Sequence, residues 1–342
     1  MNHYTRIQQL LHQLALSSKY IREVAFDIEK SIFSKQDPGV DDRHHIFVTG
    51  LARSGTTILM NELYNTNQFK SLTYNDMPFI MAPNLWSKIA GDRLGETREN
   101  KERAHGDGIM VNTDSPEAFE EVFWQTFQDN DWGMQQRPLD PESLMEDFKY
   151  FIELVLKKHK GNRYLSKNNS NVFRLNIIRK VFPNATILIP FRHPIQQAYS
   201  LFTQHQRFCK VQKNDAFIRK YMDWLGHHEF GLGYKPHKPI NNSIDYPDPT
   251  TLDHWLEQWK LIYSHILITI KENPKNLIPI CFEQLCQDSE LWESLHKRLS
   301  LKSKHQTKFE EPKKEIKSPF NEALLKDCVS IYNNLVEIEF TI

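Results

Sequence analysis

The residues best suited to chemistry in this chain form a loop at positions 50–57, with the sequence GLARSGTT. A short apolar run at 45–49 precedes it, and helical spacing of apolar residues resumes at 58–64. A loop that joins a strand to a helix in this way turns backbone amides toward an anion, and the helix dipole adds to the attraction. The pattern predicts a phosphate-binding loop, against the alternative of a glycine-rich turn that binds nothing.

The loop lacks the lysine that ATP- and GTP-hydrolysing enzymes carry directly after the second glycine, where it reaches the β and γ phosphates. Thr56 stands in that position, and the cation, Arg53, comes two residues before Gly55. We therefore expect an anion other than a nucleoside triphosphate. A P-loop kinase or nucleotide hydrolase is the first alternative.

A second candidate for anion binding is the pair Arg192 and Ser200, eight residues apart. Arg192 closely follows an apolar run at 185–189, and Ser200 falls in a helical pattern that Pro194 opens. A guanidinium group matches phosphate oxygens in geometry, and a helix hydroxyl supplies another donor from the adjacent wall. An isolated arginine is more often a surface ion-pair residue, so the pairing is what favours a phosphate.

Residues 50–57 and 189–200 together resemble the sulfotransferases that use 3'-phosphoadenosine-5'-phosphosulfate, abbreviated PAPS. The resemblance implies that Arg53 contacts the phosphosulfate and steadies the leaving oxygen. It also implies that Arg192 and Ser200 bind the 3'-phosphate. The 5'-phosphate is then held by four consecutive residues, Ser54, Gly55, Thr56 and Thr57.

The resemblance covers residues 46–63 and 164–208 well and thins elsewhere to a general pattern, including 282–285. The adenine-binding Arg-Lys-Gly stretch of the cytosolic small-molecule enzymes is absent near the C-terminus. This implies kinship with bacterial or carbohydrate-type members and leaves the adenine contacts unassigned. The implied activity is transfer of a sulfuryl group from PAPS to an acceptor hydroxyl or amine, with a carbohydrate among the candidates and 3'-phosphoadenosine-5'-phosphate as product.

The transfer needs a base to take the acceptor proton, usually His or Glu. We rank Glu117 first, His105 second and Glu121 third, and we expect Glu117 and Glu121 to share one helix face because they lie four residues apart. Solvated carboxylates are the alternative for both glutamates. Lys167 resembles a family lysine that would touch the sulfuryl oxygens, although a lone lysine is more often a surface charge.

Several other side chains are weaker candidates for the acceptor site. His205 and Phe208 are candidates to line the acceptor or adenine side, with helix packing the better interpretation for Phe208. Three tryptophans in the predicted cap are candidates to stack on a sugar ring, although packing is the more common role of such side chains. They are Trp86, Trp124 and Trp132.

The elements that must position these residues are apolar runs at 45–49, 185–189 and 276–281, which alternate with helical patterns. Such alternation predicts an α/β fold with a parallel sheet. With the resemblance, the expected architecture is a P-loop-like three-layer sandwich over 37–342. A largely helical cap is expected over about 71–160, and a final helix at 322–336 follows a charged connection.

Residues 1–36 carry an apolar stripe at helical spacing, which predicts one helix that packs on the domain or pairs with a second copy in a homodimer. The 43 basic and 43 acidic residues cancel, so nothing favours nucleic acid as a partner. The four cysteines form neither a metal motif nor a disulfide framework. We see no signal sequence or membrane span, and expect a cytoplasmic enzyme or, as a second alternative, a nucleotide-binding interaction protein without catalysis.

Overall fold

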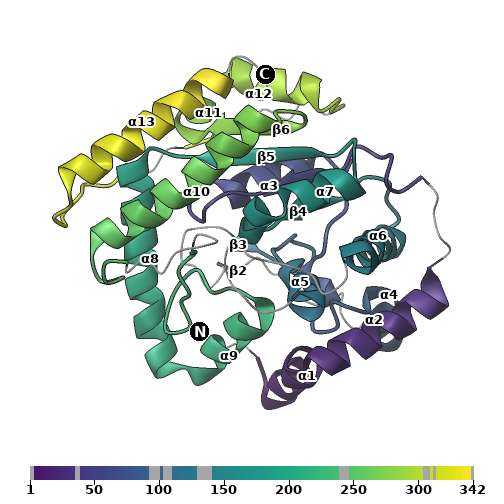
Figure 1. Cartoon of the computed structure of the whole chain (residues 1–342). Coiled ribbons are helices and arrows are strands. Elements are labelled where there is room, and N and C mark those ends of the chain that lie inside the picture. Colours follow the sequence, from purple (N-terminus) through teal and green to yellow (C-terminus); the bar gives the residue numbers. More distant parts are fainter. Residues whose placement is uncertain are drawn as a thin grey trace.

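The computed structural model describes residues 4–34, 39–91, 101–102, 110–128, 141–238, 246–302, 309–310 and 313–339. Its main sheet has four parallel strands in the order β4 (Leu165–Lys167), β1 (Ile46–Val48), β5 (Thr186–Phe191) and β6 (Leu277–Cys281) (Figure 1). The three strands predicted from apolar runs are confirmed. The short edge strand β4 was not predicted.

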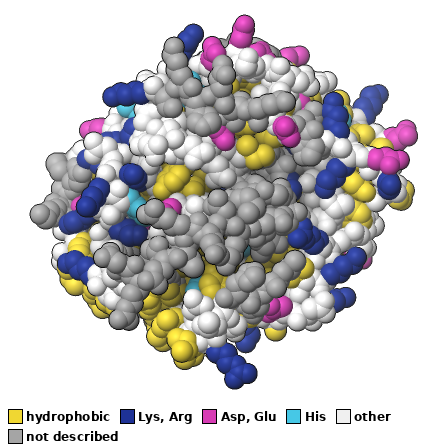
Figure 2. All heavy atoms as spheres, turned by 180° about the vertical axis from the view of Figure 1, so that it is seen from behind, with side chains coloured by type: hydrophobic (Ala, Val, Ile, Leu, Met, Phe, Trp, Pro, Cys, Tyr) yellow, Lys and Arg dark blue, Asp and Glu magenta, His cyan; other side chains and the backbone are white. Residues whose placement is uncertain are grey.

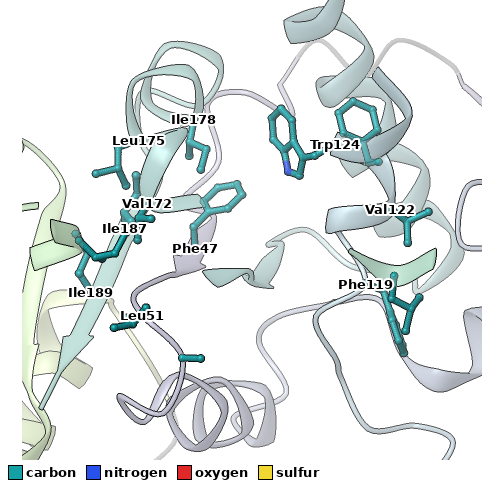
Figure 3. Close-up of a cluster of buried hydrophobic side chains, with 14 of the residues drawn as sticks. Phe47, Leu51, Phe119, Val122, Trp124, Val172, Leu175, Ile178, Ile187 and Ile189 are labelled. Atoms are coloured by element: carbon teal, nitrogen blue, oxygen red, sulfur yellow. The ribbon is translucent and has the colours of Figure 1, made fainter. Parts of the chain in front are cut away.

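Alternate strand residues enter two separate apolar clusters, one on each side of the sheet. Phe47 and Ile187 belong to the larger cluster, whereas Val48 and Leu188 belong to the smaller one. Figure 3 shows Phe47, Ile187 and Ile189 close to Val172, Leu175 and Ile178 on the larger side. Because a strand turns successive side chains to opposite faces, both faces are covered and the sheet is the middle of three layers.

The two outer layers are helical. The smaller cluster holds α3 (Thr56–Asn65), α11 (Phe282–Gln287) and α12 (Ser289–Arg298) against the sheet. The larger cluster holds α6 (Pro141–Lys158), α7 (Leu175–Val181), α8 (Pro194–Asn214), α10 (Leu252–Glu272) and α13 (Glu322–Glu339). The predicted α/β three-layer sandwich is therefore confirmed, and the predicted final helix is present.

The N-terminal segment forms two helices, α1 (Arg6–Leu16) and α2 (Lys19–Phe33), so the prediction of one helix is wrong. The chain breaks because Ser18 is extended, with φ −111° and ψ 125°, and serine favours such positions at helix starts. Leu16 and Phe26 are buried in the main core. The predicted domain boundary at residue 36 lies outside the described residues.

The predicted cap region contains a 3-10 turn at Tyr74–Asp76, α4 (Pro83–Ala90), the short strands β2 (Lys101–Glu102) and β3 (Met110–Val111), and α5 (Glu121–Phe127). In the part of the chain with assigned structure, no helix combines the length and apolar character needed to cross a membrane.

The expectation that Glu117 and Glu121 share a helix face is wrong, because α5 begins at Glu121. Pro116 instead bridges to Thr73, and the Glu117 amide donates to Leu72 O at 3.2 Å. The chain before α5 is thus held extended along residues 72–73. Glu117 is presented from this connection and Glu121 from the helix.

Candidate active site

The carboxyl ends of the four parallel strands gather the polar residues of the site along one edge of the sheet. Thr49 follows β1 and donates its amide to Leu188 O at 3.0 Å, and Asn168 follows β4 and donates to Val48 O at 3.0 Å. Arg192 follows β5, and Phe282 begins the helix after β6. Ligands of open parallel sheets bind at this edge.

The phosphate loop between β1 and α3 needs both of its glycines. Gly55 has φ 102°, and a Cβ there would lie 2.4 Å from the Phe282 ring. A Cβ on Gly50 would lie 2.8 Å from Pro190 O. Arg53 also has a positive φ, 69°, which a non-glycine residue rarely adopts and which is characteristic of functional loops.

Gln197, one turn before Ser200 on α8, fixes the loop from the side. Its Nε2 donates to Leu51 O at 3.1 Å and to Ala52 O at 3.0 Å, and its Oε1 accepts from Trp259 Nε1 at 3.0 Å. The side chain is fully buried. Helix α8 therefore anchors the loop backbone as well as carrying the second sequence signature.

The two predicted anion-binding signatures touch. Arg53 Nε donates to Ser200 Oγ at 3.2 Å, across 147 residues of sequence. Ser200 is buried, and Arg53 is half-buried. The structure thus brings the loop cation and the helix hydroxyl to one place.

Arg192 lies in the same region, with its guanidinium held by the element after β6. Its Nε lies 3.7 Å from Glu283 Oε1, which also accepts from the His193 amide at 2.8 Å. The guanidinium carbon lies 6.0 Å from the centre of the Phe282 ring. The side chain is 6% exposed, so this charge is largely removed from water.

Lys314 is a cation that sequence reasoning missed. The residue is exposed, and partial loss of solvent lowers its pKa, as does repulsion from Arg53 and Arg192. The Lys314 amide and carbonyl both bond the Gln196 side chain, each at 3.0 Å. A charge-rich connection gives no sequence signal for such a position. Three neighbouring cations suit a multiply charged anion.

A pocket borders Arg53. One wall consists of loop residues, and the rest comes from β4 and the 3-10 turn after it, the chain before α5, and the end of α9 (Ala216–Leu225) with the loop after it. Its lining is Ala52, Arg53, Thr56, Thr57, Glu117, Lys167, Asn169, Met222, His227, Glu229 and Phe230. Arg192 and Ser200 are not part of this lining. The pocket therefore joins the loop to candidate proton acceptors.

Glu117 and Lys167 both line the pocket beside the loop. The Glu117 carboxylate accepts from the Ala118 amide at 2.9 Å and from Tyr74 Oη at 3.2 Å. Lys167 is 8% exposed, so it is not a solvated surface lysine. His105 lies outside the described residues.

Glu121 faces away from the pocket into an internal ion pair. Arg174 binds both of its oxygens, at 2.7 and 2.8 Å, and Asn168 Nδ2 donates to it at 2.8 Å. Both charged side chains are almost fully buried. This bidentate pair accounts for Glu121 without a catalytic role.

Asn169 connects the loop to Glu229, and Glu229 and His227 are two pocket residues that sequence reasoning missed. Thr56 Oγ1 donates to Asn169 Oδ1 at 3.5 Å, and Asn169 Nδ2 donates to Glu229 Oε1 at 3.0 Å. Burial raises the pKa of Glu229, but the charges of His227 and Lys167, together with hydrogen bonds that include the one from Asn169, make the net shift downward. The triplet at 227–229, HHE, was the available sequence signal.

His205 packs against Tyr234 and Trp255, with ring centres 5.2 and 5.3 Å apart. Phe208 stacks on Phe230, which does line the pocket. The expectation of helix packing for Phe208 therefore holds.

Trp124 is fully buried, with Arg174 4.6 Å from its ring centre and its Nε1 donating to Glu120. Trp86 packs on Phe79. Trp132 lies outside the described residues.

The structure has a parallel sheet with a glycine-containing loop after strand β1, and Thr56 rather than lysine follows Gly55, which defines an α/β fold without the lysine signature of ATP and GTP hydrolases. The chain matches the model of the sulfotransferase family over residues 45–234. It belongs to the sulfotransferase family, and the kinase and hydrolase alternative is not favoured.

Three solved structures are similar to this chain at low sequence identity, and the first of them supports the fold. Sulfotransferase STF1 from Mycobacterium tuberculosis H37Rv is 10% identical, with a TM-score of 0.52 over 97% of this chain and 87% of that one. Sulfotransferase STF9 from Mycobacterium avium is 13% identical, with a TM-score of 0.47 over 96% and 78%. A sulfotransferase from Alicyclobacillus acidocaldarius is 13% identical, with a TM-score of 0.42 over 87% and 96%. No curated protein matches the sequence.

Proposed function

We propose that this sulfotransferase takes its sulfuryl group from PAPS and transfers it to an acceptor hydroxyl or amine. The observation that carries the proposal is the contact between Arg53 and Ser200, with Arg192 and Lys314 close by. A nucleotide phosphorylated at both the 3' and the 5' position needs two anion sites a ribose apart. The four residues supply donors and charge of the required sign.

The roles of the loop residues follow from their positions. Amides at the start of α3 suit the 5'-phosphate, because the first N–H groups of a helix have no partner within it. Ser54, Gly55, Thr56 and Thr57 are the residues assigned to this phosphate. Arg53 borders both the nucleotide side and the pocket, where it can stabilise charge on the leaving phosphate oxygen.

The reaction breaks the bond between sulfur and the 5'-phosphate oxygen and forms a bond between sulfur and the acceptor oxygen or nitrogen. The acceptor gives up one proton to a base, and the phosphate leaves with the extra negative charge. Glu117, the first base predicted from the sequence, lines the pocket and stays a candidate. His105 stays a prediction.

The pocket lining favours an acceptor that forms hydrogen bonds. Glu117 and Glu229 offer carboxylate oxygens, and Lys167 offers a buried cation for the sulfuryl oxygens. A carbohydrate hydroxyl suits such a lining, and glycans are one class to test.

All four cysteines are free thiols, which accords with the predicted cytoplasmic location.

The direct test is transfer of radioactive sulfur from PAPS to a panel of glycans, phenols, lipids and amines, with ATP hydrolysis measured in parallel. We expect a labelled acceptor and no ATP hydrolysis. ATP turnover without PAPS binding would remove the proposal. Binding of PAPS with no transfer to any acceptor would favour the interaction protein without catalysis.

We also propose that the N-terminal helices pair with a second copy of the chain. Much of the predicted apolar stripe faces outward rather than into the core. Large apolar side chains exposed by 37% to 78% are Ile7, Leu10, Leu14, Tyr20, Ile21, Val24, Ile28 and Ile32. Figure 2 shows hydrophobic side chains gathered along the lower left edge of the face seen from behind.

The exposed face includes an apolar groove of about 570 Å³ between α2 and α4, and Tyr20, Ile21, Val24 and Ile28 are part of its lining. An exposed apolar face of this kind can be buried against the same face of a second copy around a two-fold axis.

Sedimentation equilibrium tests the dimer. We expect a concentration-dependent dimer that Val24→Glu converts to monomer with unchanged melting temperature. Glu290→Gln, on exposed α12, is the control. A wild-type chain that stays monomeric at 100 μM, or one that sediments with neutral lipid vesicles, would contradict the pairing.

A further inference from the structure

His227 is a half-buried histidine in the pocket beside the phosphate loop. Its Nε2 lies 3.1 Å from Ala118 O, which neighbours Glu117. A carbonyl oxygen only accepts hydrogen bonds, so Nε2 carries the hydrogen. The neutral imidazole then has its lone pair on Nδ1, and no described residue donates a hydrogen bond to that atom.

The backbone holds His227 in this position. Gly226 ends α9 in the left-handed conformation, with φ 73°, and a Cβ there would lie 2.5 Å from Glu121 Cγ. The His227 amide donates to Met222 O at 2.9 Å, and Gln125 Nε2 donates to Asp223 O at 3.3 Å. The end of α9 is therefore packed closely on α5, which keeps the imidazole against Ala118.

The charges facing His227 come from every wall of the pocket. Arg53 belongs to the phosphate loop, Glu117 to the chain before α5, Lys167 to β4, and Glu229 to the same loop as the histidine. A positive charge on His227 and the charge of Lys167 lower the pKa of Glu229 against its burial, so the carboxylate and a protonated imidazole favour one another. A fixed negative charge stabilises the imidazolium that forms when Nδ1 takes a proton.

Glu117 is the other candidate to take the acceptor proton, but both of its oxygens already accept hydrogen bonds. One of its oxygens accepts from the Ala118 amide and the other from Tyr74 Oη. A carboxylate with a donor on each oxygen is better suited to orient an acceptor hydroxyl than to take its proton. The two residues meet at Ala118, whose amide binds Glu117 and whose carbonyl binds His227.

We propose that His227 Nδ1 is the general base of the transfer and that Glu229 is a positioning residue that stabilises its protonated form. The inference rests on the proposed function, because the proton comes from the acceptor hydroxyl that attacks the sulfuryl group. The new bond joins sulfur to the acceptor oxygen, the bond from sulfur to the phosphate oxygen breaks, and the acceptor proton moves to Nδ1.

The first test compares His227→Asn, His227→Gln and Glu117→Gln in the full chain. The probe is labelled sulfate released when PAPS transfers to water, with affinity for 3'-phosphoadenosine-5'-phosphate measured separately. We expect both His227 variants to lose about 10²- to 10⁴-fold in rate. Nucleotide affinity should stay within threefold, and added imidazole should restore part of the rate. His44→Asn, an exposed position, is the control.

Two outcomes of that comparison separate the claims. Loss of rate in Glu117→Gln but not in either His227 variant would overturn the inference and leave the proposed function intact. Failure of the wild-type chain to bind 3'-phosphoadenosine-5'-phosphate would remove the proposed function itself.

The second test does not use activity. Nitrogen-15 NMR of labelled histidine at pH 8 should show His227 with its hydrogen on Nε2, and a hydrogen on Nδ1 would overturn the inference. Glu229→Gln should move the acidic limb of the pH–rate profile to lower pH, because the imidazolium loses a favourable charge. A lower rate with an unmoved limb would show that Glu229 is only structural.

Discussion

Arg53 Nε donates a 3.2 Å hydrogen bond to Ser200 Oγ, which joins the loop after the first strand to the helix after β5. Gln197, on the same helix, binds two carbonyl oxygens of the loop. These contacts give the loop and the helix one fixed geometry. In the proposed function, the loop and α8 therefore bind the two phosphates of one nucleotide as a single rigid unit.

Replacement of Arg53 tests the transition-state role of this unit. We expect Arg53→Ala to lower kcat by about 10²- to 10³-fold, because the guanidinium meets charge that develops on the leaving oxygen. Ser200→Ala removes one neutral donor and should weaken nucleotide binding by about tenfold. Steady-state kinetics with PAPS checks both values. Arg219→Ala, at an exposed position on α9, is the control, and near-normal kinetics in Arg53→Ala would contradict the role.

Gly55→Ala should disrupt the phosphate loop. The added methyl group meets the Phe282 ring, and the residue must keep φ 102°. We expect a cost of about 1–3 kcal/mol from the backbone strain alone, with loss of measurable nucleotide binding. Gly91→Ala is the matched control, since Gly91 also has a positive φ but no atom lies within 4 Å of the added position. Equal melting temperatures and equal affinities in the two variants would argue against the assigned constraint.

Glu121→Gln separates a structural carboxylate from a catalytic one. The change leaves the buried Arg174 guanidinium without its counter-charge, and breaking a buried pair costs about 3–5 kcal/mol. We expect a lower urea midpoint and, for the protein that remains folded, nucleotide affinity close to wild type. Glu290→Gln should change neither property. A Glu121→Gln protein of normal stability that is inactive would restore Glu121 as the base.

We expect the protein to lose stability in mild acid because His45 is buried in its neutral form. Burial is the main cause that lowers its pKa from 6.5 to about 4. Its Nδ1 accepts from the Tyr164 amide, which a protonated ring cannot do. Below pH 6.5 the unfolded chain binds more protons than the folded one. Stability should therefore fall by up to about 3 kcal/mol as the pH drops from 6.5 to 4.

Urea unfolding at pH 7 and pH 5 measures this effect. His45→Asn should be less stable at pH 7 but lose less between the two pH values than the wild-type chain. An equal loss in both proteins would assign the acid sensitivity to other groups.

The parts of the candidate site that depend on short stretches of sequence could be predicted. Gly50 and Gly55 mark the loop because only glycine tolerates those contacts, and Arg192 and Ser200 follow a recognisable strand and helix start. The three predicted strands were recognisable as apolar runs for the same local reason. Their parallel arrangement then places the loop and Arg192 on one edge.

Residues placed by tertiary contacts were missed. The packing of Gly226 on α5 holds His227 in the pocket, and hydrogen bonds with the Gln196 side chain hold the Lys314 backbone in place. Contacts between residues so far apart in the sequence cannot be predicted from local spacing. The shared helix face of Glu117 and Glu121 failed because Pro116 pairs with Thr73, a contact far along the chain that overrides spacing.

Calorimetry with 3'-phosphoadenosine-5'-phosphate, 5'-AMP and ADP tests the central claim most directly. We predict at least tenfold tighter binding of the 3'-phosphorylated nucleotide, because Arg192 adds a charge-assisted bond of about 1.5–3 kcal/mol. Arg192→Ala should abolish this preference and leave 5'-AMP binding unchanged. Equal affinity for the three nucleotides, or tighter binding of ADP, would contradict the account.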